Sequence, residues 1–283
     1  MSNMNAYLVS HNKLKNNLYM VGALRFMTKY YDTVYFLCKH KYLSNVAMFF
    51  QDTDKIVCVP FDENNEFEEI KQILSEKYTD PQYDIFVCGF CHKAYLSSKI
   101  TNTVFLEACK APVNHLTASR DTVDFDTLTT SGYGFIEDFY RDIGLSLTHF
   151  YKYFRLPSTD ESEILYDSIT EYYIIFIQLT SSDGTCLNIS ELLSKYLYDN
   201  LVILICNDRN LYDPENQPIK HKLAMQFVYN KMVHYTKTIL NSDEIYIIDS
   251  CFTGMVLPYI KTHQLKTQKI RIILREMAER IIL

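Results

Sequence analysis

Hydroxyl, amide and carboxylate side chains gather in three loops of the second half of the chain, each directly after a run of apolar residues. The loops are Thr180-Ser181-Ser182-Asp183-Gly184, Asn207-Asp208 and Asp249-Ser250-Cys251-Phe252-Thr253-Gly254. Hydroxyls and backbone N–H groups in the first and third loops suit a diphosphate, whereas a carboxylate or amide in the second suits a ribose or a base. A Ser or Thr at such a place can equally be an ordinary helix cap.

The third of these loops closes the stretch Asn241–Gly254, which predicts a loop, a strand and a helix in succession. Asp243 and Glu244 form an acidic loop, Ile245–Ile248 a buried strand, and the next helix opens at about Met255. Such a turn presents backbone N–H groups and the positive end of a helix dipole, where phosphate is readily held. The chain has neither a GxGxxG fingerprint nor a Walker loop, which disfavours nicotinamide cofactors and P-loop NTP hydrolysis.

A fourth polar loop, His11–Asn17, follows the first predicted strand and belongs at the corresponding edge of the first half. A histidine there could act as a base, and a lysine could neutralise phosphate. The alternative interpretation is a solvated polar loop. Asp62–Glu69 is most simply a solvated loop and helix start, because acidic residues are favoured at the positive end of the helix dipole.

Cys88-Gly89-Phe90-Cys91-His92 fits a dithiol pattern and formally a haem-attachment pattern. A thioredoxin-like pair belongs after an early strand of a small domain, whereas this one follows the fourth strand of a larger sheet. We therefore expect a buried structural Cys88. Neither a second C-x-x-C nor a histidine pair at ligand spacing accompanies it, so we expect no metal site.

The composition predicts a soluble cytoplasmic protein with a sizeable core. Of 283 residues 48% are hydrophobic, and the net charge is −6, which disfavours nucleic acid as a partner. The amino terminus lacks a signal-peptide pattern, and the chain contains no apolar run long enough for a membrane span. The basic run Lys261–Arg280 has apolar residues at helical spacing and predicts an amphipathic closing helix. The oligomeric state stays open.

Short β-rich runs alternate with amphipathic stretches along most of the chain. The predicted strands are Ala6–Ser10, Thr33–Cys38, Lys55–Val59, Asp84–Cys88, Tyr172–Leu179, Leu201–Cys206 and Ile245–Ile248. This rhythm is typical of parallel βαβ units. We therefore predict an α/β protein with two Rossmann-like domains, residues 1–157 and 158–283, facing each other across a cleft where strand ends bind ligand.

The chain resembles the two-domain GT-B glycosyltransferases, and more closely the heptosyltransferase-like enzymes of large DNA viruses and some bacteria. The residues that carry the resemblance are YLVSHNKLKNNLYMVGALRFMTKYYDTVYFLCK, YYIIFIQLTSSDG, LVILICNDRNLY and ILNSDEIYIIDSCFTG. Together they cover most of the chain apart from residues about 92–135. A viral protein of this kind would lie in the host cytoplasm.

The resemblance implies transfer of a sugar from a nucleotide-diphosphate donor to a glycan or other hydroxyl acceptor, with no cofactor and no metal. The donor would lie on the C-terminal domain and the acceptor on the N-terminal domain. By position, Thr180, Ser181, Ser182 and the Ser250–Gly254 turn beside Asp249 would face the donor phosphates. Asn207, Asp208 and the Val233-His234-Tyr235 piece would lie near the ribose or base.

The first loop departs from the family pattern. Relatives commonly show a Gly-x-Gly-Asp type of loop, where this chain has Lys13-Leu14-Lys15-Asn16. Asn16 falls where the family's carboxylate base would sit, and an amide is not a useful proton acceptor at neutral pH. Either His11 or another carboxylate takes the role of base, or activity has been lost. Three hypotheses stay open: a glycosyltransferase, a catalytically silent binding or assembly protein of the same fold, and a thiol-redox protein.

Overall fold

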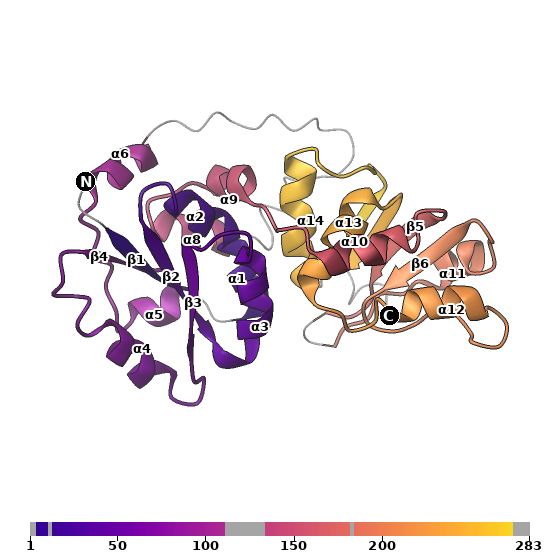
Figure 1. Cartoon of the computed structure of the whole chain (residues 1–283), viewed down its shortest axis with the longest axis horizontal. Coiled ribbons are helices and arrows are strands. Elements are labelled where there is room, and N and C mark those ends of the chain that lie inside the picture. The colour runs from indigo at the N-terminus through magenta and orange to yellow at the C-terminus, as the bar shows by residue number, and fades with distance from the viewer. Residues whose placement is uncertain (1–3, 11–12, 111–133, 182–183, 274–283) are drawn as a thin grey trace. The chain divides into compact units, whose positions relative to one another are not determined.

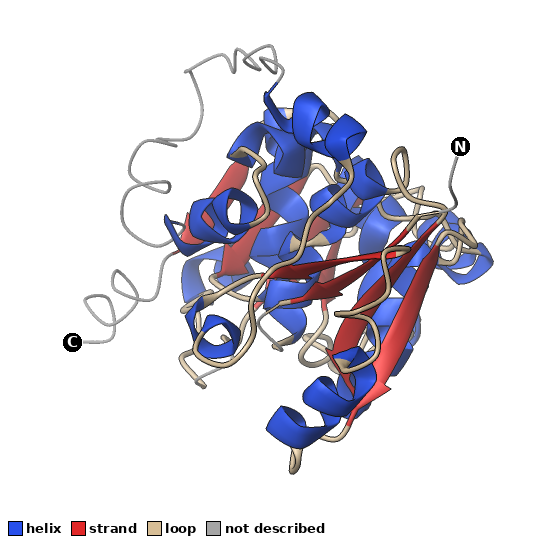
Figure 2. Ribbon diagram, turned by 90° about the vertical axis from the view of Figure 1, so that its left-hand side faces the viewer, coloured by secondary structure: helices blue, strands red, loops and turns tan. Residues whose placement is uncertain are grey.

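The computed structural model describes residues 4–10, 13–110, 134–181 and 184–273, which divide into two compact units. The first unit extends to Pro157 and the second begins at Ser158. In each unit helices flank a parallel sheet (Figures 1 and 2), which confirms the predicted α/β class. Among the described residues, no helix is both long and apolar enough to cross a membrane.

The first unit is built on a four-stranded parallel sheet in the order β3-β2-β1-β4. Its strands are β1 (Asn5–Val9), β2 (Thr33–Lys39), β3 (Ile56–Phe61) and β4 (Tyr83–Val87). Its helices are α1 (Leu14–Tyr19), α2 (Val21–Met27), η1 (His40–Tyr42), α3 (Leu43–Val46), η2 (Ala47–Phe50), α4 (Glu66–Leu74), α5 (Phe90–Lys93), α6 (Thr103–Lys110), α8 (Gly134–Asp142) and α9 (Leu147–Tyr153). The strands predicted for this half are confirmed.

Both faces of the first sheet are covered, as the apolar strand sequences predict. Tyr7 and Val9 of β1 belong to a core cluster with Ile70 and Leu74 of α4. Leu8, between them, is fully buried, and it points to the opposite face because successive strand side chains alternate. A strand covered on both sides has apolar residues at nearly every position.

The helical stretch after β1 is broken at Met20 into α1 and α2. The Tyr140 hydroxyl lies in the break, where it accepts a hydrogen bond from the Ala23 N–H at 3.0 Å and donates one to the Tyr19 carbonyl at 2.8 Å. A side chain inserted between the N–H and C=O groups of a helix is a known cause of such breaks.

The second unit repeats the plan with the strand order β6-β5-β7-β8, again all parallel. Its strands are β5 (Tyr173–Gln178), β6 (Val202–Cys206), β7 (Glu244–Ile248) and β8 (Ile270–Ile273). Its helices are α10 (Asp160–Asp167), α11 (Ser190–Tyr196), α12 (Pro218–Met225), η3 (Met232–Tyr235), α13 (Thr236–Asn241) and α14 (Cys251–Lys261).

Two predictions for the end of the chain were wrong. The closing helix over 261–280 is contradicted, because α14 ends at Lys261 and Ile270–Ile273 forms β8 beside β7. Its isoleucines occur at helical spacing, but they are β-branched and complete the sheet edge; residues 274–283 of that prediction lie outside the described part of the chain. Helix α14 also begins at Cys251, four residues before the predicted Met255, because Ser250 caps it.

Glu244 was assigned to an acidic loop, yet it begins β7 and is only 3% exposed. Its carboxylate accepts hydrogen bonds from three tyrosine hydroxyls and an ammonium group. The donors are Tyr173 at 2.9 Å, Tyr196 at 3.0 Å, Tyr246 at 2.7 Å and Lys269 at 3.2 Å. Burial alone would raise the pKa of Glu244, but these hydrogen bonds outweigh it and hold the pKa below its usual value.

We expect Glu244→Gln to lower the free energy of unfolding at pH 7 by roughly 1–2 kcal/mol, because the amide replaces one acceptor oxygen with a donor. A depressed carboxyl pKa stabilises the fold above the usual glutamate range near pH 4, and that contribution is lost as the pH falls through the folded-state pKa. Urea titrations from pH 7 to pH 3 test both points. The variant must lose less stability on acidification than the wild type, and equal losses would contradict this role.

Candidate functional site

The three polar loops of the second unit lie along one sheet edge. They follow β5, β6 and β7, which are parallel neighbours in the order β6-β5-β7. The carboxyl ends of such strands meet at a single edge, where α/β proteins commonly bind ligands. We refer to this place as the carboxyl edge of the second unit.

The first two loops are joined by the carboxylate of Asp208. One oxygen accepts hydrogen bonds from the backbone N–H groups of Leu179 at 2.7 Å and Thr180 at 3.2 Å, and the other accepts one from Gln178 Nε2 at 3.0 Å. Ser181 is 5% exposed, and its N–H donates to the Thr185 carbonyl at 2.9 Å. Asp208 therefore fixes the end of β5, while Ser182 lies outside the described residues.

The third loop forms a capping box at the start of α14. Ser250 Oγ accepts from the Phe252 N–H at 3.2 Å, and Thr253 Oγ1 accepts from the Ser250 N–H at 3.1 Å. Asp249 is half-buried and its N–H donates to the Ile273 carbonyl at 2.9 Å, whereas Gly254 is buried in the first turn. The ordinary capping role of Ser250 is thus present, and the N–H groups of Ser250, Phe252 and Thr253 donate within the capping box.

Asn207 and Tyr235 come together although 28 positions separate them. The Tyr235 hydroxyl donates to Asn207 Oδ1 at 2.6 Å. Beside it, His234 is 9% exposed and its Nδ1 lies 2.7 Å from Asn230 Oδ1. Burial lowers the pKa of His234, which favours the neutral imidazole. These side chains form a polar corner at the carboxyl end of β6.

In the first unit, Asn16 lies in the first turn of α1, is half-buried, and donates its backbone N–H to the Lys13 carbonyl at 2.9 Å. His11, the other predicted base, falls outside the described residues. Asn16 carries an amide rather than a carboxylate, so neither predicted residue provides a base among the residues that the structure describes.

A carboxylate that sequence reasoning missed lies at the carboxyl edge of the first sheet. Glu66, at the start of α4, has Oε2 3.0 Å from Lys39 Nζ and Oε1 3.7 Å from His92 Nε2. His92 Nε2 also lies 3.0 Å from the Ser10 carbonyl, and Nδ1 lies 2.8 Å from the Tyr95 hydroxyl. Because a carbonyl can only accept, we assign the proton to Nε2.

Glu66 is reachable and His92 is not: their side chains are 28% and 2% exposed. The histidine is held by the turn after β4, where Gly89 has φ +83° and donates its N–H to Asp142 Oδ2 at 2.9 Å. A positive φ of this size suits glycine. The only sequence signal for Glu66 and His92 was that each follows a predicted strand.

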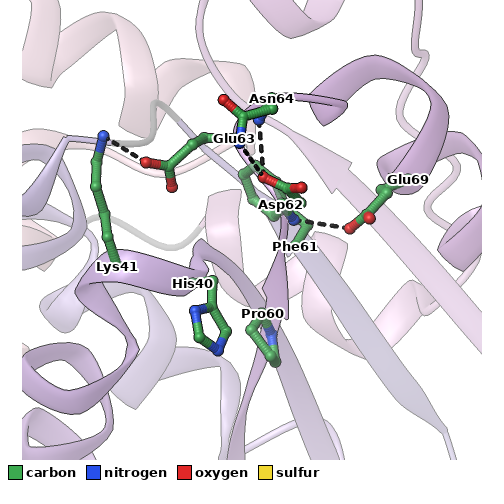
Figure 3. A pocket seen from close by; sticks show the side chains of 8 residues that line it. All are labelled: His40, Lys41, Pro60, Phe61, Asp62, Glu63, Asn64 and Glu69. Carbon is green, nitrogen blue, oxygen red and sulfur yellow. Dashed lines mark hydrogen bonds and ion pairs between the residues drawn. The ribbon is translucent and has the colours of Figure 1, made fainter.

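An open hollow of about 560 Å³ lies at the carboxyl end of β3. Several of the residues that line it are close to Glu66 in the sequence. Its lining residues are His40, Lys41, Pro60, Phe61, Asp62, Glu63, Asn64 and Glu69. Figure 3 shows the Lys41 ammonium and the Glu63 carboxylate pointing toward each other. Lys41 Nζ lies 2.8 Å from Glu63 Oε1, and Glu69 Oε2 accepts a hydrogen bond from the Asp62 N–H at 2.7 Å. Carboxylates and an amide around an open hollow are suited to hydroxyl-rich ligands.

Cys88 is fully buried, as predicted, and burial raises the pKa of its thiol well above the ordinary value. A thiol that stays protonated is a poor nucleophile. This environment disfavours a dithiol redox role for Cys88.

The fold, with two parallel four-stranded sheets, matches the GT-B fold of a solved heptosyltransferase structure. The structure of ADP-heptose LPS heptosyltransferase II from E. coli matches over 97% of this chain and 94% of its own, with a TM-score of 0.52 and 11% sequence identity. E. coli heptosyltransferase WaaC with ADP matches over 96% and 91%, with a TM-score of 0.46 and 11% identity. The sequence matches no protein-family model and no curated protein. Likeness to viral enzymes stays a prediction.

Proposed function

We propose that this protein is a glycosyltransferase that moves a sugar from a nucleotide-diphosphate donor to a hydroxyl acceptor. The observation that carries the proposal is the GT-B likeness, which extends over 97% of the chain rather than over one Rossmann-like unit. The fold alone does not define an activity.

The donor is proposed to bind at the carboxyl edge of the second unit. The positive end of the α14 dipole and the hydroxyls of the Thr180–Ser181 turn suit the diphosphate, since a helix N-terminus favours anions and hydroxyls can donate to phosphate oxygens. Asn207, His234 and Tyr235 suit the ribose or base. In this role Asp208 acts through the loop it holds, because its oxygens already accept from Leu179, Thr180 and Gln178.

Glu66 is proposed as the general base. It would take the proton of the acceptor hydroxyl while the acceptor oxygen bonds to the anomeric carbon and the diphosphate leaves with the electron pair of the broken bond. An alcohol needs this proton removal to become a competent nucleophile. Lys39 would position the carboxylate, and the neighbouring hollow at Asp62 would receive the acceptor.

A catalytically silent binding or assembly protein is the second candidate. Asn16, at the position of the family's carboxylate, favours it. This candidate predicts nucleotide binding without turnover of any donor.

Isothermal titration of the full chain with ADP, GDP, UDP and CMP tests the donor site. We expect at least one nucleotide to bind. ADP is the first candidate because the matched E. coli structure is named for ADP-heptose. Substituting Asp208 with Ala should weaken that binding, because the Thr180 turn loses the acceptor for two backbone N–H groups. No binding by any of the four at millimolar concentration would contradict both candidates.

A further inference from the structure

Tyr229 is an exposed aromatic residue in a backbone conformation that aromatic residues seldom adopt. Its φ is +54° and its side chain is 80% exposed. Left-handed φ values are uncommon outside glycine and asparagine, and a bulky residue there is a genuine outlier. His263, the other described non-glycine residue with positive φ, directly follows the C-cap of α14, where a left-handed residue ordinarily ends a helix.

The place of Tyr229 is fixed at the polar corner. Its N–H donates to the Asn207 carbonyl at 2.8 Å, directly after β6. The next residue, Asn230, donates its N–H to the Tyr235 hydroxyl at 3.1 Å and lies 2.7 Å from His234 Nδ1. The exposed Tyr229 ring is thus attached to a backbone segment that is hydrogen-bonded to Asn207, Tyr235 and His234, the residues suited to the ribose or base.

Folding does not account for an aromatic ring at this position. The ring packs little, because it is 80% exposed, and glycine or asparagine would adopt the backbone at lower cost. Strained residues that the surroundings hold in place cluster at ligand sites. Exposed aromatic rings are also the common platform for bases, since every base offers a π-face.

A buried acceptor lies in the same corner. Asn230 Nδ2 donates to the Gln226 carbonyl at 3.1 Å, so Asn230 Oδ1 accepts and His234 Nδ1 carries the proton. His234 Nε2 is then an acceptor, and it has no hydrogen-bond partner among the residues that the structure describes. Burial lowers the pKa of His234 and so keeps this acceptor unprotonated. A buried acceptor without a donor invites a ligand N–H or O–H.

We propose that Tyr229 is the surface on which the base of the donor nucleotide stacks. This inference rests on the proposed function, because it names the residue that binds the base at that same site. It makes Tyr229 an affinity-determining residue, and it assigns no part of the sugar transfer to its hydroxyl.

Titration of full-length variants with ADP, GDP, UDP, CMP and pyrophosphate tests the proposal. Tyr229→Ala should lower the affinity for every nucleotide that the wild type binds, by about 5- to 100-fold. The affinity for pyrophosphate, which has no base, should be unaffected. Tyr229→Phe should keep the wild-type affinity because its ring still stacks. Tyr198→Ala is the matched control, since Tyr198 is 76% exposed but lies before β6, at the opposite end of that strand.

Tyr229→Gly separates binding from folding. Its melting temperature should rise because glycine relieves the positive φ, while its nucleotide affinity should fall as in Tyr229→Ala. Unchanged nucleotide affinity in Tyr229→Ala, or equal losses for nucleotide and pyrophosphate, would overturn the stacking role. If the wild type binds none of the nucleotides, the proposed function itself fails, and that result is visible before any variant is measured.

Discussion

Replacing Glu66 with glutamine is expected to reduce kcat/KM for sugar transfer by roughly 100- to 10,000-fold, the usual contribution of a positioned general base. Glutamine keeps the size of the side chain and can still accept a hydrogen bond from Lys39, which lies 3.0 Å from Glu66 Oε2. It cannot take a proton at neutral pH. Nucleotide affinity should stay unchanged, because the donor is proposed to bind on the second unit.

Glu68→Gln is the matched control for this variant. Glu68 lies in the same first turn of α4 and is exposed, so its substitution removes the same charge from the same helix. Release of nucleoside diphosphate measures turnover for both variants. Equal activity of Glu66→Gln and wild type would exclude Glu66 as the base and return the role to His11 or another group.

Gly22→Ala is expected to lower the free energy of unfolding by about 3 kcal/mol, at the upper end of the usual cost of overpacking. A Cβ at residue 22 would lie 2.6 Å from the carbonyl oxygen and 2.8 Å from the Cα of Phe150. Both atoms belong to the backbone of α9, so a rotamer change cannot relieve the clash. In an open helix the same substitution would stabilise by about 1 kcal/mol, because alanine favours helix.

Gly184→Ala is the comparison for this variant. A Cβ there meets no atom of the described residues within 4 Å, but the residue has φ +89°, so backbone strain opposes the change, at a cost of about 1–3 kcal/mol. Urea unfolding of both variants separates steric clash from strain. A stabilised Gly22→Ala would show that α2 and α9 are further apart than described.

Strands β1 to β7 were predictable because each is a short apolar run bounded by polar residues. The sequence YYIIFIQL, for example, is β5 with one flanking residue at each end. Strand β8 was missed because Ile270 and Ile273 are three positions apart, a spacing that a helix also produces. Glu244 was assigned to a loop because the tyrosines that make its burial possible are distant in sequence, apart from Tyr246.

The candidate site was predictable only where it follows from strand order. The loops of Thr180, Asn207 and Ser250 share an edge because parallel neighbours end together. The Glu66–His92 pair depends on a tertiary contact between residues that follow β3 and β4, the two outer strands of the sheet. No local pattern encodes such a contact. The backbone angle of Tyr229 was likewise beyond sequence reasoning, because tyrosine does not signal a left-handed residue.

The central claim, transfer from a nucleotide-diphosphate sugar, is tested most directly by diphosphate release. The full chain is incubated with ADP-, GDP- and UDP-sugars, with and without a mixture of saccharide acceptors, and the released nucleoside diphosphate is measured. We predict release from at least one donor, faster with acceptor present and strongly reduced in Glu66→Gln. Nucleotide binding without release from any donor would instead identify a catalytically silent protein of this fold and contradict the proposed activity.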